Sequence, residues 1–188
     1  MTRHEKKYKF TEDWNYLNYG SLEIIGKRLA NQYTNSPINI LELGTLEGRS
    51  ALYMFHNYCT NRKSTVTTID WELEENLEYN LEMCNTDRLK FILSNFFDII
   101  PKLLNDDIKY ELIYIDGGKS SKITIFQIVN CWEILKIGGI LYFDDFTWGT
   151  GIHHSIERPR EAILFFLKTF KDDYELIFKT DQVAVVKK

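Results

Sequence analysis

The sequence has few cysteines and no long apolar run, and each shortage excludes a class of protein. Cys59, Cys84 and Cys131 are odd in number and widely spaced, so we expect free thiols instead of a disulfide or zinc framework. No stretch reaches the ~18 apolar residues that a membrane-spanning helix needs. The charged start, Met1 to Lys7, is not followed by the apolar segment of a secretion signal. We therefore expect a cytoplasmic protein with no membrane partner.

An excess of positive charge is also missing. The 23 lysines and arginines are outnumbered by 27 aspartates and glutamates, which gives a net charge of -4. We therefore expect no nucleic-acid partner. Apolar residues, in contrast, make up 44% of the 188 residues, enough for one sizeable core. We predict a single domain, with a helical cap over residues 1–36 and a core over residues 37–188.

Segments typical of strands and of helices alternate along the chain. Apolar residues spaced three or four apart predict helices between short apolar runs, and those runs predict buried strands at 38–43, 65–70, 89–93, 111–116 and 140–143. Residues 174–178 and 182–186 predict a closing antiparallel hairpin. Such alternation requires a parallel sheet with right-handed crossovers. The fold class is therefore α/β, with a seven-stranded, mostly parallel sheet.

The segment from Asn39 to Ser50 is the most informative, because a buried strand there breaks into a glycine-containing loop that opens a helix. Gly44 and Gly48 would let the backbone turn tightly and approach a ligand. Glu42 would place an acceptor carboxylate at the mouth of the crevice. A dinucleotide-binding loop, Gly-x-Gly-x-x-Gly, would need glycine at positions 46 and 49, where the chain has leucine and arginine. An NAD-dependent oxidoreductase is thus a weaker alternative, and a turn with no ligand is another.

The loop resembles motif I of the class I S-adenosylmethionine (SAM) dependent methyltransferases, in which an acidic residue precedes two glycines at these spacings. The resemblance implies SAM as cofactor and a Rossmann-like sheet with strand order 3-2-1-4-5-7-6 and an antiparallel C-terminal hairpin strand. It also implies a set of cofactor-binding residues at the strand ends: Glu42, Gly44, Thr45, Leu46, Gly48, Ser50, Asp70, Trp71, Asn95 and Asp116.

Several of these residues have a role that their chemistry supports. Asp70 could accept hydrogen bonds from both ribose hydroxyls, and backbone N–H groups at the first turn of the helix could hold the methionine carboxylate. Glu42 would bind the ammonium group of SAM directly or through water. Trp71 is either an adenine-stacking surface or a buried core tryptophan. Asn95 either contacts the adenine amine or caps a helix.

A second group of carboxylates ends the fourth and fifth strands. Asp116, Asp144 and Asp145 could together hold a hard divalent cation such as Mg²⁺, or they could cap helices and bind loop amides. The pattern resembles the metal-dependent catechol and caffeoyl-coenzyme A O-methyltransferases, whose corresponding motifs are Asp-x-x-Lys and Asp-Asn. That resemblance makes Asp116 and Lys119 the candidate catalytic residues, with Lys119 as base. A surface lysine is the alternative.

A resemblance over almost the whole chain is to the Methyltransferase_24 group of small bacterial-type class I methyltransferases. Its marks are Leu46-Glu-Gly-Arg-Ser50, Ile115-Asp-Gly117, Gly138-Gly139, Phe143-Asp-Asp-Phe146, Arg158-Pro-x-x-Ala-Ile163 and Gln182-Val183. Members usually have histidine at the position of Lys119. The fold would bring Trp148, His153, His154 and Arg158 to the acceptor, with residues 148–152 as a lid.

The function predicted from the sequence is transfer of the SAM methyl group to a hydroxyl of a small molecule, such as a sugar or a phenol, with divalent-metal assistance as an option. N-methylation and SAM binding without catalysis are the alternatives. We also expect that aromatic residues such as Tyr16, Tyr19 and Phe146 could form the face of a homodimer.

Overall fold

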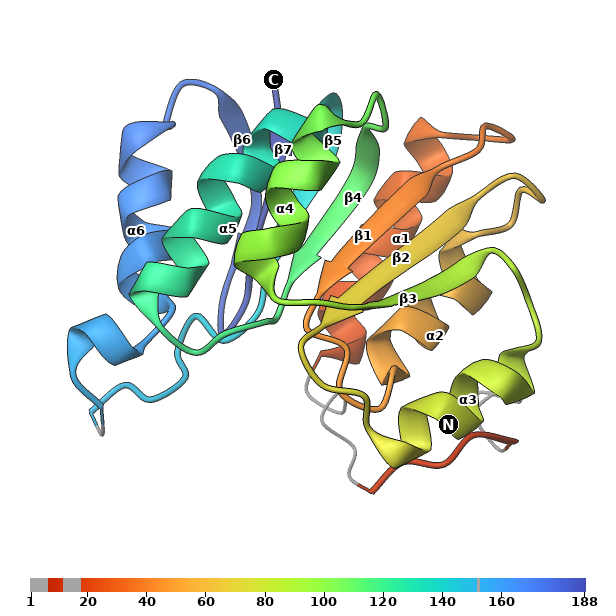
Figure 1. Cartoon of the computed structure of the whole chain (residues 1–188). Helices are drawn as coiled ribbons and strands as arrows, with labels where there is room; N and C mark the ends of the chain where they lie inside the picture. Colours follow the sequence, from red (N-terminus) through yellow and green to blue (C-terminus); the bar gives the residue numbers. More distant parts are fainter. Residues whose placement is uncertain (1–6, 12–17, 152) are drawn as a thin grey trace.

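Seven strands form one sheet in the computed structural model of the chain, which describes residues 7–11, 18–151 and 153–188 (Figure 1). The strands are β1 (Asn39–Leu43), β2 (Thr65–Asp70), β3 (Leu89–Leu93), β4 (Tyr110–Ile115), β5 (Leu135–Phe143), β6 (Tyr174–Lys179) and β7 (Val183–Lys187). Their order is β3-β2-β1-β4-β5-β7-β6. The first five are parallel, and β7 runs antiparallel to both β5 and β6. The predicted fold class and strand order are confirmed.

Two layers of helices cover the sheet (Figure 1). One layer contains α1 (Tyr19–Gln32), α2 (Arg49–Tyr58) and α3 (Glu75–Cys84), and the other contains α4 (Phe96–Asn105), α5 (Ser121–Ile134) and α6 (Arg160–Thr169). A short 3-10 helix, Ser155–Glu157, precedes α6. No helix in the described part of the chain has the length and apolarity to cross a membrane.

The alternation of side chains along each strand divides the core between these layers. In β1, Leu41 and Leu43 pack in the cluster under α4, α5 and α6, whereas Ile40 packs in the cluster under α1 and α2. The neighbouring strand β4 behaves in the same way, with Ile113 on one face and Tyr114 on the other. Inner strands buried on both faces are typical of a parallel sheet covered by helices.

Strand β5 is longer than predicted. The sequence places Gly138 and Gly139 at the end of the preceding helix, but both lie inside a strand that begins at Leu135. The reason is tertiary pairing: Leu135 pairs with Tyr110, and the register with β4 shifts before the regular pairing resumes at Ile140. Gly138 has a φ of +79°, a conformation that glycine adopts without strain.

Candidate cofactor and acceptor site

The loop between β1 and α2 lies against the end of β4, and glycine makes this approach possible. A Cβ on Gly44 would lie 2.7 Å from the carbonyl carbon and oxygen of Asp116 and from the nitrogen of Gly117. Gly44 also has a φ of +97°, which strains any residue with a side chain. Gly48, with a φ of +80°, is the N-cap residue of α2. The backbone that follows β4 therefore requires a glycine at position 44 of the loop.

Asp70 fixes the same loop from the end of β2. Its Oδ2 atom accepts hydrogen bonds from the backbone N–H groups of Thr45 (2.7 Å) and Leu46 (3.2 Å), and its Oδ1 atom accepts one from Trp71 (2.7 Å). A carboxylate can accept about four hydrogen bonds, so Oδ1 keeps acceptor capacity for a ligand hydroxyl. Asp70 is thus a loop anchor that can also bind a ligand.

Glu42 lies beneath the loop, and the expectation of a carboxylate at the mouth of the crevice is wrong. Its side chain is fully buried and accepts hydrogen bonds from Ser50 Oγ and Thr68 Oγ1, each at 2.5 Å. Thr45 joins the group through a 2.6 Å contact between its Oγ1 atom and that of Thr68. Burial raises the pKa of Glu42 to about 7, although the two hydroxyl donors oppose this rise. Glu42 and Ser50 therefore support the loop and do not line its surface.

Exposed apolar side chains lie in the loop and at the nearby ends of β2 and β3. The Trp71 side chain is 69% exposed, which excludes the alternative of a buried core tryptophan. Leu46 in the loop and Leu93 at the end of β3 are each about half exposed. The Asn95 side chain caps α4 by accepting a hydrogen bond from the Phe97 N–H at 2.8 Å, as the alternative interpretation proposed. Its amide oxygen accepts this hydrogen bond, and its amide nitrogen could donate to a ligand.

Lys119 joins the ends of β4 and β5. Its ammonium group forms an ion pair with Asp145 Oδ2 and lies 3.3 Å from Asp116 Oδ1. Burial and the nearby Asp144 carboxylate raise the pKa of Asp116, and Lys119 partly opposes this rise. A pocket between these strand ends and the starts of α5 and α6 is lined by Asp116, Asp144, Asp145 and Pro159 among others. Asp116, Lys119 and Asp145 thus form one charged cluster at the pocket.

Asp144 differs from its neighbours because other parts of the chain use its lone pairs. Its Oδ1 atom accepts hydrogen bonds from Gln182 Nε2 (3.0 Å) and from the Asp145 N–H (2.8 Å). Its Oδ2 atom accepts from Tyr114 OH (2.5 Å) and Asn18 Nδ2 (3.1 Å). Four donors match the acceptor capacity of a carboxylate.

The predicted metal site does not assemble from Asp116, Asp144 and Asp145. In the described ranges, no group of three or more histidine, cysteine, aspartate or glutamate side chains is arranged to hold a metal ion. Asp144 has no acceptor position left, and a lysine already neutralises part of the charge of the other two. These residues therefore do not fit a divalent cation as they are arranged here.

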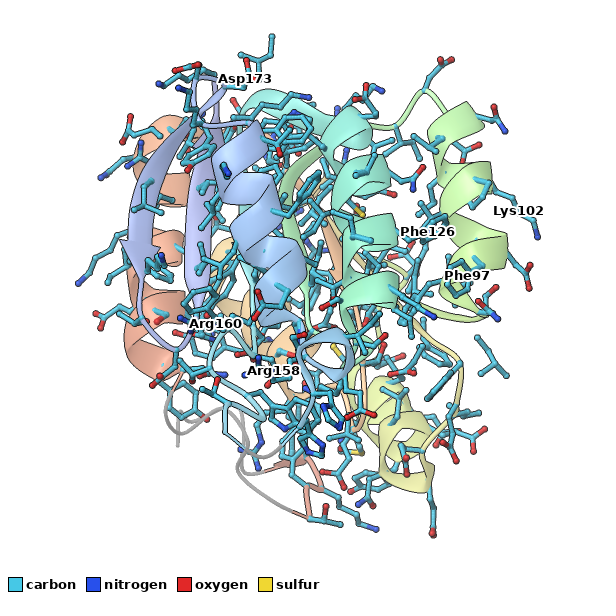
Figure 2. The ribbon with its side chains drawn as sticks, turned by 90° about the vertical axis from the view of Figure 1, so that its left-hand side faces the viewer. Phe97, Lys102, Phe126, Arg158, Arg160 and Asp173 are labelled. Carbon is cyan, nitrogen blue, oxygen red and sulfur yellow. The ribbon has the colours of Figure 1, made fainter. Side chains whose placement is uncertain are left out.

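The predicted acceptor residues come together only in part. The Trp148 and His153 rings stack with their centroids 4.9 Å apart, and Lys119 Nζ lies 5.9 Å from the Trp148 ring centroid. His154 is exposed and takes part in capping the 3-10 helix that follows it. Arg158 is mostly buried and contacts Glu161 at 3.3 Å near the start of α6 (Figure 2). Ile152 of the predicted lid lies outside the described residues.

The sequence did not indicate the role of two polar residues that support the site from within the sheet, although Gln182 belongs to one of the family marks. Thr68 lies directly opposite Glu42 in the register of β1 and β2, and Gln182 precedes β7 beside the end of β5. Both are buried. The signal that could have found Thr68 is a polar residue at an inward position of an apolar strand.

The N-terminal segment also contacts the glycine loop. The Thr11 N–H lies 2.9 and 3.0 Å from the two carboxylate oxygens of Glu47, and Asn80 forms hydrogen bonds with both the N–H and the carbonyl of Lys9. Glu47 and Asn80 are buried. Residues 7–11 therefore hold the outer side of the loop and α3 together.

A sheet in this strand order, with a glycine loop after β1 and an acidic residue ending β2, defines the class I methyltransferase fold. Comparison with known families makes the assignment more specific. The Methyltransferase domain family, Methyltransf_24, matches residues 41–146, which is more than half of the chain. The chain belongs to this family.

Individual relatives agree with the family. A protein of Arabidopsis thaliana, named as a candidate caffeoyl-CoA O-methyltransferase, is 27% identical over 138 residues, which cover 69% of this chain and 59% of that protein. The chain therefore spans less than two thirds of the length of this relative.

Solved structures show the same fold at low sequence identity. The O-methyltransferase TomG of Streptomyces achromogenes, in complex with SAM, is 16% identical with a TM-score of 0.66 over the whole of both chains. The methyltransferase MycE of the mycinamycin biosynthetic pathway, in complex with Mg and S-adenosylhomocysteine (SAH), is 16% identical with a TM-score of 0.64, covering 96% of this chain and 51% of that one.

Proposed function

We propose that this chain is a SAM-dependent methyltransferase that methylates a hydroxyl oxygen of a small molecule and releases SAH. The observation that carries the proposal is the loop of residues 44–48, which Asp70 anchors at the end of β2 with acceptor capacity to spare. Relatives named as O-methyltransferases and similar structures in complex with SAM or SAH support both the cofactor and the type of acceptor.

The loop and its neighbours offer binding groups for the ribose, the adenine and the methionine carboxylate of SAM. Asp70 Oδ1 would accept a hydrogen bond from a ribose hydroxyl, and Trp71 would stack against adenine. The first turn of α2 would hold the methionine carboxylate with its N–H groups. Asn95 would contact the adenine ring through its amide nitrogen. Glu42 contributes indirectly, by keeping the loop in place from below.

Methyl transfer needs the acceptor oxygen to be aligned with the methyl carbon of SAM and one proton to be removed from the acceptor hydroxyl. The acceptor oxygen forms a bond to the methyl carbon while the bond from carbon to sulfur breaks, so the sulfonium of SAM becomes the neutral thioether of SAH. The acceptor proton passes to a base at the pocket, which we assign to the Asp116 carboxylate, with the ammonium group of Lys119 beside it. Trp148 and His153 would flank the acceptor and exclude water.

The acceptor is a small molecule in this proposal, and a phenol or a sugar has the hydroxyl that the reaction needs. We also propose a cytoplasmic location, supported by three free cysteines. A homodimer is a further proposal, but Phe146 cannot form its face because this side chain is buried. Tyr16 lies outside the described residues, so Tyr19 is the aromatic candidate left for that face, and size-exclusion chromatography of wild type and Tyr19→Ala would test it.

Calorimetric titration with SAM, SAH and NAD tests the proposal first. We expect SAM and SAH to bind in the micromolar range and NAD not to bind. Asp70→Ala should weaken SAM binding at least tenfold, because it removes both the loop anchor and the ribose acceptor. Asp173→Ala, in the loop before β6, is the matched control and should bind SAM as wild type does. Failure of wild type to bind SAM would refute the proposed function.

Turnover separates catalysis from binding alone. SAH release in the presence of phenols, catechols and sugars should exceed release without an acceptor. Asp116→Asn should lower this release at least a hundredfold at saturating SAM. SAM binding without turnover of any hydroxyl acceptor would favour the alternative of a non-catalytic SAM-binding protein. Turnover of amines alone would favour N-methylation.

A further inference from the structure

The charged side chains at the ends of β4 and β5 are arranged so that the ammonium group of Lys119 occupies the place where a metal ion would bind between carboxylates. The fold places three carboxylates here, Asp116, Asp144 and Asp145, and a divalent cation would need oxygen atoms from them with free lone pairs. Two features of the described residues oppose this use. One concerns Asp144, and the other concerns the position of the lysine.

Asp144 is committed to the protein scaffold. Its four donors come from the start of α1, from β4, from the residue before β7 and from its own neighbour in the chain. Gln182, one of these donors, is itself fixed by a 2.6 Å hydrogen bond from Tyr142 OH. Binding of a metal by Asp144 would break contacts to several elements at once. We therefore regard Asp144 as a positioning residue.

What Asp144 positions is the next residue. The Asp145 N–H donates to Asp144 Oδ1, and Asp145 has a φ of +59°, which is unusual for a residue with a side chain. In this conformation the Asp145 carboxylate reaches the ammonium group of Lys119. An aspartate adopts this left-handed conformation at a modest cost in backbone energy, which the ion pair with Lys119 and the hydrogen bond to Asp144 offset.

The ammonium group of Lys119 then lies between the carboxylates of Asp145 and Asp116. A lysine has three N–H donors, and the two carboxylates use two of them. The third remains for a bound acceptor, and the Trp148 ring centroid lies 5.9 Å from the ammonium nitrogen. This donor could bind an acceptor oxygen as negative charge develops on it during proton loss, which is the electrostatic task of a metal in related chemistry.

We propose that Lys119 replaces a divalent cation at this site, so that the chain positions and polarises its acceptor hydroxyl without a metal. The proposal rests on the proposed function for the identity of the acceptor, but the charge arrangement can be tested without any turnover. Lys119 contacts the acceptor in this proposal and is a catalytic residue, whereas Asp144 acts through Asp145.

Binding of Mn²⁺ alone, measured by electron paramagnetic resonance of the free ion, tests the replacement. Wild type is compared with Lys119→Met, which removes the charge and keeps the chain length, and with Asp145→Asn. We expect wild type to bind Mn²⁺ with an affinity within threefold of that of Asp145→Asn. We expect Lys119→Met to bind it at least tenfold more tightly than wild type, because two carboxylates lose their cation.

Either of two results would overturn the proposal. One is a single Mn²⁺ site in wild type whose affinity falls tenfold or more in Asp145→Asn, since the carboxylates would then hold an ion in the presence of the lysine. The other is a Lys119→Met variant that binds Mn²⁺ no more tightly than wild type.

A SAM titration of the same proteins keeps this test separate from the proposed function. Lys119→Met and Asp145→Asn should bind SAM within threefold of wild type, which shows that both are folded with an intact cofactor pocket. If wild type does not bind SAM, the proposed methyltransferase function fails, while the comparison of Mn²⁺ affinities still decides whether the lysine excludes the ion.

Discussion

Glu42 should make the stability of the free protein depend on pH in a way that one substitution removes. Its carboxyl group is fully buried beneath the glycine loop, and burial raises its pKa from 4.5 to about 7. The folded state therefore binds more protons than the unfolded state between these values. Stability is highest below pH 4.5 as far as this group is concerned, and it falls as the pH rises through about 7.

The size of the effect follows from the pKa. A rise from 4.5 to about 7 corresponds to about 3 kcal/mol, at about 1.4 kcal/mol per pH unit. Glu42→Gln keeps the shape and cannot ionise, and its amide can still bond to the hydroxyls of Ser50 and Thr68. The stability of this variant relative to wild type should thus improve by ~3 kcal/mol between pH 4.5 and pH 8. Urea unfolding at a series of pH values measures both proteins.

Asp116, whose pKa is also raised, contributes to the pH dependence of stability in both wild type and Glu42→Gln. The difference in stability between the two proteins therefore isolates the contribution of Glu42. A second variant tests the cause. Ser50→Ala removes a donor that lowers the pKa of Glu42, so the pH dependence should become steeper than in wild type. A stability difference between Glu42→Gln and wild type that stays constant within about 1 kcal/mol over this pH range would refute the reasoning.

Three further substitutions give separate tests of the site. Gly44→Ala should destabilise the protein by ~3 kcal/mol in urea unfolding, because the new Cβ would clash with the backbone after β4 and because φ is positive at this position. Gly20→Ala, which has open space around it, should not destabilise the protein, and equal effects of the two substitutions would contradict the close approach at Gly44. Asp144→Asn should lower stability by ~2 kcal/mol in urea unfolding, because an amide group then faces donors, and should leave Mn²⁺ affinity unchanged; a stable variant with altered Mn²⁺ binding would contradict a scaffold role. Trp71→Ala should weaken SAM binding about tenfold in calorimetry without loss of stability, and the reverse pattern would mean that this exposed side chain serves packing.

The sequence predicted the sheet well because its strands are short apolar runs separated by helical patterns. Strand order followed from the resemblance, and the ends of β1, β2 and β4 were identified to within about one residue. The start of β5 was not predictable from the local sequence, because Gly138 and Gly139 are typical of the end of a helix. Pairing of Leu135 with Tyr110 nevertheless makes both glycines part of the strand. Tertiary pairing outweighs local propensity at this position.

For the site, the sequence predicted which residues lie at the strand ends but not what each one contacts. Asp144 receives hydrogen bonds from Asn18 and Gln182, which are 126 and 38 residues away in the chain. Nothing in the run Phe143-Asp-Asp-Phe146 indicates that the first aspartate would be saturated and the second left to pair with a lysine. Glu42 was misplaced for a similar reason, because its hydroxyl partner Thr68 belongs to another strand.

Acidic residues at the ends of the strands therefore divide into two kinds by burial and by the hydrogen bonds that they already accept. Glu42 is fully buried with a hydroxyl donor on each oxygen, and Asp144 accepts four hydrogen bonds, so a ligand would gain little from them and their loss should appear mainly as lost stability. Asp70 is partly exposed and accepts three hydrogen bonds, and Asp116 faces Lys119, so both keep acceptor capacity for a ligand and their loss should appear mainly as lost binding or turnover. The same carboxyl group can thus serve structure or chemistry at one sheet edge, and burial together with the donors from distant segments decides which.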